Sequence, residues 1–134
     1  MNQTAVRTVT VEREFAHAPE KLWRALTQPE LIAEWLMKND FLPSNGHEFT
    51  LQGDWGSVAC RVLELEPQKT LSYTWDAMGL ESTVTWTLTP TASGTHLRME
   101  QEGFRPDQEQ AYQGAKYGWQ KFFGSLDSVL ARLA

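Results

Sequence analysis

The stretch GAKYGWQKFFGSLDSVLARL, residues 114–133, decides how the chain folds, because a helical period of apolar residues runs through it together with three glycines. Apolar residues recur every three or four positions, which predicts an amphipathic helix that covers a sheet. At ~100° per residue, the apolar positions of this last helix fall within a sector of roughly 80°. They are Ala111, Ala115, Trp119, Phe122, Leu126, Val129 and Leu133.

The two sides of this apolar sector differ in bulk. One side carries Tyr112, Phe123 and Leu130, and the other carries Gly114, Gly118 and Ser125, while Gly124 falls on the outer surface of the helix. A glycine in a helix interior costs about 1 kcal/mol relative to alanine. The small side therefore either lets the sheet approach the helix backbone closely or leaves room for a ligand. The sequence keeps both interpretations open.

The rest of the chain supplies the other elements. Residues 7–15 alternate between apolar and polar side chains, which predicts a half-buried strand. Pro19 and Pro29 each suit the first turn of a short helix, and KNDFLPSNGHE, residues 38–48, has the composition of a loop. Five strands separated by turn residues follow, and the alternation changes parity around Arg61 and Glu64, which predicts a β-bulge. The five strands are expected at residues 47–52, 57–65, 70–76, 82–89 and 95–104.

Short turns between successive strands allow only antiparallel pairing, because a parallel connection needs a dozen or more residues. Each strand has one apolar face, as Val84, Trp86 and Leu88 show, so the sheet has a single apolar surface for the last helix to cover. The sequence predicts an α+β fold in one domain, residues 1–134. The expected architecture is an antiparallel sheet of about six strands with two short helices after the first strand.

Composition and charge exclude several classes of protein. The net charge is −5 with no run of basic residues, so nucleic acid is not an expected partner. Cys60 is the single cysteine, which rules out an internal disulfide and suits a reducing compartment. No stretch approaches the ~20 apolar residues of a membrane span, and the first residues lack the apolar core of a signal peptide. We expect a cytoplasmic protein.

The sequence offers no converging set of catalytic groups. His17, His47 and His96 lack the spacing of a metal site, and there is no nucleophile motif or phosphate loop. We therefore expect no catalytic residue, no metal and no cofactor. His47 is more simply a surface residue than an acid or base. Gln101 shares the dry face of its strand, where it either orients a ligand carbonyl or hydroxyl or lies at the wet end of the sheet.

Several segments together resemble a known family. They are VEREFAHAPEKLWRALTQPELIAEWL (residues 11–36), NGHEF (45–49), LSYTW (71–75), GTHLRMEQEGF (94–104) and GW (118–119). In order and spacing they resemble the activator-of-heat-shock-protein-90-ATPase homology family, a branch of the START-like helix-grip (SRPBCC) superfamily. The resemblance covers almost the whole chain. It implies a curved antiparallel sheet that grips the C-terminal helix around a cavity, which other superfamily members use for lipids, sterols, polyketides and similar apolar molecules.

Two positions depart from the family pattern. Gly46 is followed by His47 where the family often has two glycines, and Trp35 is followed by Leu36 where a pair of tryptophans is frequent. We expect His47 and Leu36 to shape the mouth of the cavity.

The resemblance also implies where a ligand would bind. We expect non-enzymatic binding of a small apolar or aromatic molecule between the sheet and the last helix. One alternative is a chaperone-associated interaction domain, and another is a cyclase or hydrolase-like enzyme in which His47, Gln101 or Tyr73 handles protons. The expected lining residues are Trp35, Leu36, His47, Phe49, Tyr73, Trp75, Trp86, Met99, Gln101, Gly114, Gly118, Trp119 and Phe122.

Overall fold

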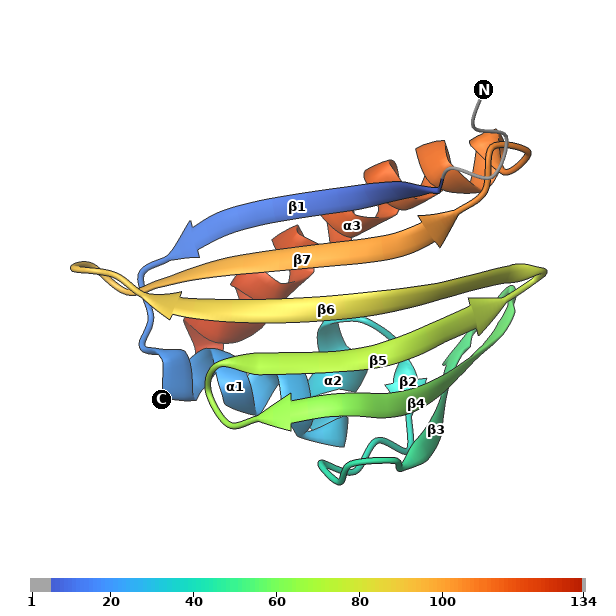
Figure 1. The fold of residues 1–134 in the computed structure, drawn as a ribbon. Coiled ribbons are helices and arrows are strands. Elements are labelled where there is room, and N and C mark those ends of the chain that lie inside the picture. Colours follow the sequence, from blue (N-terminus) through green and yellow to red (C-terminus); the bar gives the residue numbers. More distant parts are fainter. Residues whose placement is uncertain (1–5, 134) are drawn as a thin grey trace.

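The structure is a computed structural model that describes residues 6–133. A strand is followed by two short helices, then by six strands and a long final helix (Figure 1). The elements are β1 (Arg7–Phe15), α1 (Pro19–Thr27), α2 (Pro29–Trp35), β2 (Lys38–Asn39), β3 (Glu48–Gly53), β4 (Gly56–Glu66), β5 (Thr70–Ala77), β6 (Leu80–Pro90), β7 (Thr95–Phe104) and α3 (Glu109–Arg132).

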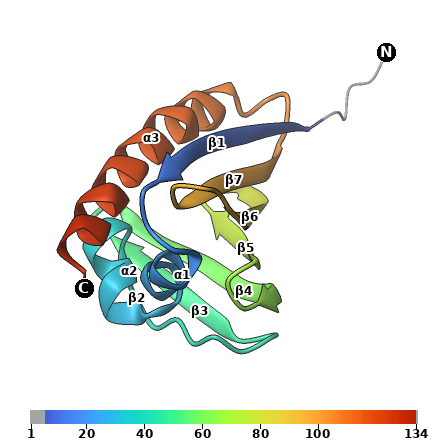
Figure 2. The same ribbon diagram turned by 90° about the vertical axis from the view of Figure 1, so that its left-hand side faces the viewer.

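The strands form one antiparallel sheet in the order β1-β7-β6-β5-β4-β3-β2. The chain returns from β7 through α3, which runs across the same face of the sheet as α1 and α2 (Figure 1). Figure 2 shows the sheet curving around these helices. Buried apolar residues of the strands and of the helices form one core between them. The predicted α+β helix-grip architecture is confirmed.

Two local features of the sheet concern strands β4 and β2. The predicted β-bulge is confirmed, because the register between β4 and β5 shifts between Val62 and Glu64. The seventh strand, β2, lies within the segment that we expected to be a loop. The Asn39 side-chain amide donates to the carbonyl oxygens of Pro29 and Met37, and its oxygen accepts the Phe41 N–H at 3.0 Å. These bonds fix the local turn, while Lys38 and Asn39 pair with Gln52 and Leu51 of β3; two residues are too few to show alternation.

The buried face of α3 is rotated, relative to the expected apolar sector, toward the side that carries Phe123 and Leu130. Trp119, Phe123, Leu126, Val129 and Leu130 are buried, whereas Phe122 is half-buried and Ala111 is exposed. From the apolar faces of their elements we expect Val84, Trp86, Leu97, Trp119, Phe122 and Leu126 to be largely buried; five of them are buried, and Phe122 is half-buried. The same alternation predicts that Thr83, Thr85, His96 and Arg98, on the polar faces of β6 and β7, are exposed. Arg98 is exposed, whereas the other three are half-buried because neighbouring strands flank them.

The interior is densely packed toward the C-terminal half of α3. Phe123 stacks on Trp86 with ring centroids 5.9 Å apart and on Phe15 at 6.3 Å. Trp35 meets the Trp86 ring edge-on at 5.6 Å and donates its indole N–H to the Ala25 carbonyl at 2.8 Å. We call this region, formed by Phe15, Trp35, Trp86 and Phe123, the solid end. Toward the start of α3 the side chains become small, and the packing there is not continuous.

Candidate functional site

A cavity of about 690 Å³ lies between the first half of α3 and the ends of β5, β6 and β7. Its volume is in the range of small-molecule sites. Aromatic and aliphatic side chains form most of its wall: Trp55, Trp75, Phe104, Trp119, Phe122, Met37, Ala77, Met78 and Leu80. The helix contributes Ala111, Gly114, Ala115 and Gly118, and the polar lining consists of Gln101, Gln108 and Gln110.

The small side of α3 forms one wall of this cavity. A Cβ atom added at Gly114 or Gly118 would meet no heavy atom within 4 Å beyond the helix backbone. The structure therefore rejects the close-approach interpretation of these glycines. Their missing side chains leave space, and larger residues at these positions would project into the cavity or its mouth.

Gln101 is the polar group in the interior of the cavity. Its side chain is 2% exposed on β7 and takes part in a chain of hydrogen bonds with β5, β6 and α3. The Trp119 indole N–H donates to Gln101 Oε1 at 2.7 Å, and Gln101 Nε2 donates to Ser82 Oγ at 3.0 Å. Ser82 Oγ donates in turn to the Trp75 carbonyl oxygen at 2.8 Å. This network fixes the Trp119 ring of α3 relative to the sheet and reaches β5 through the Trp75 backbone carbonyl.

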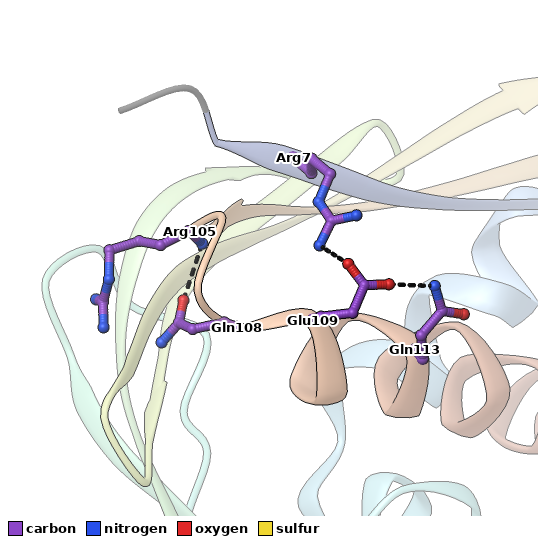
Figure 3. Close-up of polar contacts among 5 residues, drawn as sticks. All are labelled: Arg7, Arg105, Gln108, Glu109 and Gln113. Carbon is purple, nitrogen blue, oxygen red and sulfur yellow. Dashed lines mark hydrogen bonds and ion pairs between the residues drawn. The ribbon is translucent and has the colours of Figure 1, made fainter. Parts of the chain in front are cut away.

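The mouth of the cavity combines exposed apolar side chains with a hydrogen-bonded loop. Trp55, in the turn between β3 and β4, is 54% exposed, and Met78, in the turn between β5 and β6, is 87% exposed. Gln108 accepts the Arg105 backbone N–H at 2.9 Å through Oε1 and donates to the Gly79 carbonyl at 3.2 Å (Figure 3 draws the first contact). Gln108 thus joins the start of α3 to the β5–β6 turn.

Figure 3 also shows how the start of α3 is joined to β1. Glu109 accepts from the Arg7 guanidinium at 2.7 Å through Oε1 and from the Gln113 amide at 2.7 Å through Oε2. The hydrogen bond from Gln113, followed by that from Arg7, holds the pKa of the Glu109 carboxyl below its usual value of 4.5. The start of α3 is therefore anchored to β1 as well as to the β5–β6 turn.

Among the residues that the structure describes, the cavity lining includes no side chain suited to acid–base or nucleophilic chemistry. Within residues 6–133, its lining includes no acidic or basic residue and no histidine, tyrosine, cysteine, serine or threonine. Cys60 and Tyr73 lie elsewhere in the interior, and burial raises the pKa of the Cys60 thiol to about 12. Burial also raises the pKa of Tyr73, whose hydroxyl accepts the Trp86 indole N–H at 2.9 Å. Both side chains are neutral at physiological pH.

The residues expected from the sequence to line a cavity fall into two groups. Trp75, Gln101, Gly114, Gly118, Trp119 and Phe122 lie together around it. The cavity is not lined by Trp35, Leu36, Phe49, Tyr73, Trp86 or Met99, which fill the rest of the core, or by His47.

His47 lies away from the cavity mouth, on the loop before β3. Its ring stacks on Phe49 with centroids 6.3 Å apart, and its Nε2 lies 3.2 Å from the Asp40 carbonyl oxygen. Tyr73 is also packed against Phe49 and does not line the cavity. Of the three suggested proton-handling residues, His47, Gln101 and Tyr73, Gln101 alone reaches the cavity, so they do not form a common site.

Sequence reasoning missed the other residues that line the cavity. They are Met37, Trp55, Ala77, Met78, Leu80, Phe104, Gln108, Gln110, Ala111 and Ala115. A signal was present at two of them, because Trp55 and Met78 are large apolar residues inside the turn segments GDWG and AMGLE. Turn residues are usually polar, so bulky apolar residues there indicate a surface with another role.

Two further features bear on metal binding and on membrane insertion. Among the described residues there is no group of three or more His, Cys, Asp or Glu side chains that could hold a metal ion. None of the helices in residues 6–133 combines the length and apolar character that crossing a bilayer requires.

Comparison with known families agrees with the geometry of sheet, helix and cavity. Residues 16–131 match the family described as Activator of Hsp90 ATPase homolog 1-like protein. The chain belongs to this family. Its helix-grip fold and family membership support a ligand-binding domain in general terms. No curated protein matches the sequence.

Solved structures resemble this family member over nearly its whole length. Protein MLL2253 from Mesorhizobium loti is 61% identical, with 96% of this chain and 99% of that chain covered and a TM-score of 0.93. BH1534 from Bacillus halodurans is 26% identical, with coverages of 96% and 99% and a TM-score of 0.84. DynU16, from the dynemicin biosynthetic locus, is also 26% identical at a TM-score of 0.84, and the match covers 93% of this chain and 47% of that chain.

Proposed function

We propose that this protein binds a small, uncharged apolar molecule in the cavity between α3 and the sheet and does not transform it chemically. The observation that carries the proposal is the lining itself: about 690 Å³ of space walled by aromatic and aliphatic side chains, with three glutamines as its polar side chains. Ligand sites are mostly apolar with a few placed polar groups, which describes this cavity.

The charge of the ligand follows from the same lining. A charged group moved from water into an apolar site without a partner costs far more than it gains. Among the described residues no charged side chain lines the cavity to pair with a cation or an anion. The ligand is therefore neutral in the part that enters the cavity.

The absence of titratable groups from the lining argues against catalysis. General acid–base catalysis needs a side chain within hydrogen-bond reach of the reacting proton, and covalent catalysis needs a nucleophile. The cavity-lining side chains of residues 6–133 include neither. Binding alone is the activity that this set of groups can perform.

A neutral dye that fluoresces in apolar surroundings, N-phenyl-1-naphthylamine, tests the proposal in a direct titration. We expect the wild-type protein to bind the dye with saturation at one site. Gly118→Leu places an isobutyl group in open space beside the cavity. We expect it to weaken dye binding by about tenfold or more.

Gly124→Leu is the matched control. Gly124 lies on the same helix and also has open space around its Cβ position, but it does not line the cavity. Dye binding to Gly124→Leu should equal that of the wild type. A wild-type protein that binds no dye, or an equal loss in both variants, would contradict the proposal.

The chaperone-associated alternative is supported by the family description, which refers to activation of the Hsp90 ATPase. A pull-down with the heat-shock protein 90 of the host organism tests it. Retention of that chaperone by wild type and by Gly118→Leu alike would assign the interaction to a surface separate from the cavity.

A further inference from the structure

We infer that Gln101 makes the cavity selective for ligands that carry a hydrogen-bond acceptor oxygen, such as a ring ketone. The inference rests on the proposed function, since it specifies which molecules the cavity prefers. It follows from how the amide of Gln101 is held, from the capacity that this amide has left, and from the surfaces that surround it.

Two independent contacts fix which end of the amide is oxygen and which is nitrogen. An indole N–H can only donate, so the amide atom 2.7 Å from Trp119 Nε1 must be the acceptor Oε1. Ser82 Oγ uses its single hydrogen on the Trp75 carbonyl at 2.8 Å, so it must accept from Nε2 at 3.0 Å. A rotated amide would oppose donor to donor at Trp119 and acceptor to acceptor at Ser82.

The amide nitrogen retains an unused donor. A primary amide has two N–H groups, and among the described residues Gln101 Nε2 donates to Ser82 alone. The side chain is 2% exposed, and the cavity is the open space that it borders. Buried N–H groups in proteins are nearly always paired, so a ligand oxygen in the cavity would complete the bonding of this group.

An acceptor is the best complement to this site. Oε1 already receives the Trp119 indole N–H, whereas the second N–H of Nε2 has no acceptor in the described protein. A carbonyl or ether oxygen can accept that N–H and has no hydrogen of its own to place. A ligand hydroxyl can also accept, but its own hydrogen then needs a further acceptor.

The other two glutamines do not duplicate this role. Gln108 uses its oxygen on the Arg105 backbone and its nitrogen on the Gly79 carbonyl at the mouth. Gln110 is exposed on the first turns of α3. The aromatic rings beside Gln101 are closely spaced, with centroids of Trp75 and Trp119 5.2 Å apart and those of Trp119 and Phe122 5.4 Å apart. These faces favour a flat ring system around the acceptor.

Fluorene and 9-fluorenone are a matched pair of probes for this inference, because they share a ring system and differ by the carbonyl oxygen. Their dissociation constants are measured by displacement of bound N-phenyl-1-naphthylamine. Fluorene is the more apolar of the two, so transfer from water alone would favour fluorene. We expect the wild-type protein to bind 9-fluorenone about tenfold more tightly.

Gln101→Met keeps a side chain of similar length and removes the amide. We expect the preference for 9-fluorenone to disappear in this variant. Gln120→Met, the same substitution at an exposed glutamine of α3 that does not line the cavity, should keep it. A measurement without any variant complements these: the side-chain amide resonances of Gln101 in the ¹H–¹⁵N spectrum should shift with 9-fluorenone and much less with fluorene.

The outcomes separate this inference from the proposed function. If neither compound displaces the dye and the dye itself does not bind, the proposed function fails. If both compounds bind the wild type equally, or if Gln101→Met keeps the preference, the cavity binds apolar molecules but Gln101 does not select them. If Gln101→Met does not fold, the preference of the wild-type protein and the resonance shifts of Gln101 still test the inference.

Discussion

At the scale of single residues, Trp119 links stability to binding. Its ring lies between Trp75 and Trp86, with centroids 5.2 and 5.6 Å away, and forms part of the cavity wall. Its indole N–H holds the buried Gln101 oxygen. A buried carbonyl without a donor costs about 1–3 kcal/mol. The same hydrogen bond therefore stabilises the fold and orients the amide that we assign to the ligand.

Gln101 and His47 show what can be inferred about single residues from sequence. Strand alternation alone places Gln101 on the dry face of β7, and it is indeed buried beside the cavity. Its partners could not be predicted, because Ser82, Trp119 and Trp75 come from separate elements that meet only in the folded chain. His47 was expected near the mouth from a family pattern, which does not specify how the loop before β3 turns.

The carboxyl of Glu109 predicts how stability depends on pH. Its pKa is lowered below 4.5 by the hydrogen bonds from Gln113 and Arg7, so the folded state binds the proton more weakly than the unfolded chain does. The contribution of Glu109 to stability is then fully present above the unfolded pKa and is lost as the pH falls through the folded pKa.

We expect Glu109→Gln to lower the urea midpoint most near neutral pH, and the difference from wild type to shrink as the pH falls below 4.5. Urea unfolding at a series of pH values measures this. The variant should keep part of the acid sensitivity, because hydrogen bonds from Ser93 and Thr91 lower the pKa of Glu14 in the same direction. A difference that stays constant with pH would contradict the role of Glu109.

At the scale of elements, α3 is divided between two tasks. Its second half fills the solid end with Phe123, Leu126 and Leu130, all without measurable exposure. Its first half presents Ala111, Gly114 and Gly118 to the cavity. The helical period predicted the element, but it could not show that the buried side turns toward Phe123. That rotation depends on how the helix rests on β1 and on the α1–α2 pair.

The glycines within α3 should make the helix less stable than alanine would at the same positions. We expect Gly118→Ala and Gly124→Ala each to raise the free energy of unfolding by about 0.5–1 kcal/mol, because alanine is the better helix former. Neither Cβ would meet an atom within 4 Å outside the helix backbone. Urea unfolding at neutral pH gives both values.

Gly103→Ala is the contrasting variant on β7. Its backbone has φ +129°, and a Cβ there would lie 2.6 Å from the Glu81 carbonyl oxygen. We expect this substitution to destabilise the protein, since neither the conformation nor the space suits alanine. If Gly118→Ala proves as destabilising as Gly103→Ala, another part of the protein must lie close to the backbone at Gly118. That result would contradict the open space at Gly118 on which the cavity depends.

At the scale of the whole molecule, the sequence predicted the architecture better than the cavity. Alternation and turn residues specify antiparallel neighbours, and a single apolar face requires a covering helix. The position of the cavity depends on where small side chains from several elements face one another in the folded protein. Trp55 from the β3–β4 turn and Met78 from the β5–β6 turn meet α3 there although they are far apart in sequence. Local sequence patterns do not show which distant residues come together in the folded protein.

The interior is densely packed at the solid end and contains the cavity at the other end, which we call the hollow end. The two ends should differ in local stability. Regions with fewer buried contacts open at lower free energy. Residues 110–118 of α3 border the cavity, whereas residues 123–130 pack on Phe15 and Trp86. We expect backbone amides of residues 110–118 to exchange with deuterium faster than those of residues 123–130 in the free protein.

Ligand binding should change this pattern in a specific way. An opening that releases the ligand becomes less frequent by the factor 1 + [L]/Kd, so a free dye concentration of about 100 Kd slows such openings about 100-fold. We expect N-phenyl-1-naphthylamine at this excess to slow exchange in residues 110–118 and in the β5–β6 turn, which contributes Met78 to the mouth. The β6–β7 turn, residues 91–94, lies at the opposite end of β6 and is held by hydrogen bonds from Thr91 and Ser93 to Glu14. Its local openings leave the ligand in place, so its exchange should not change. Slowing at residues 91–94 without slowing at residues 110–118 would place the dye outside the cavity and contradict the division of the interior into a solid and a hollow end.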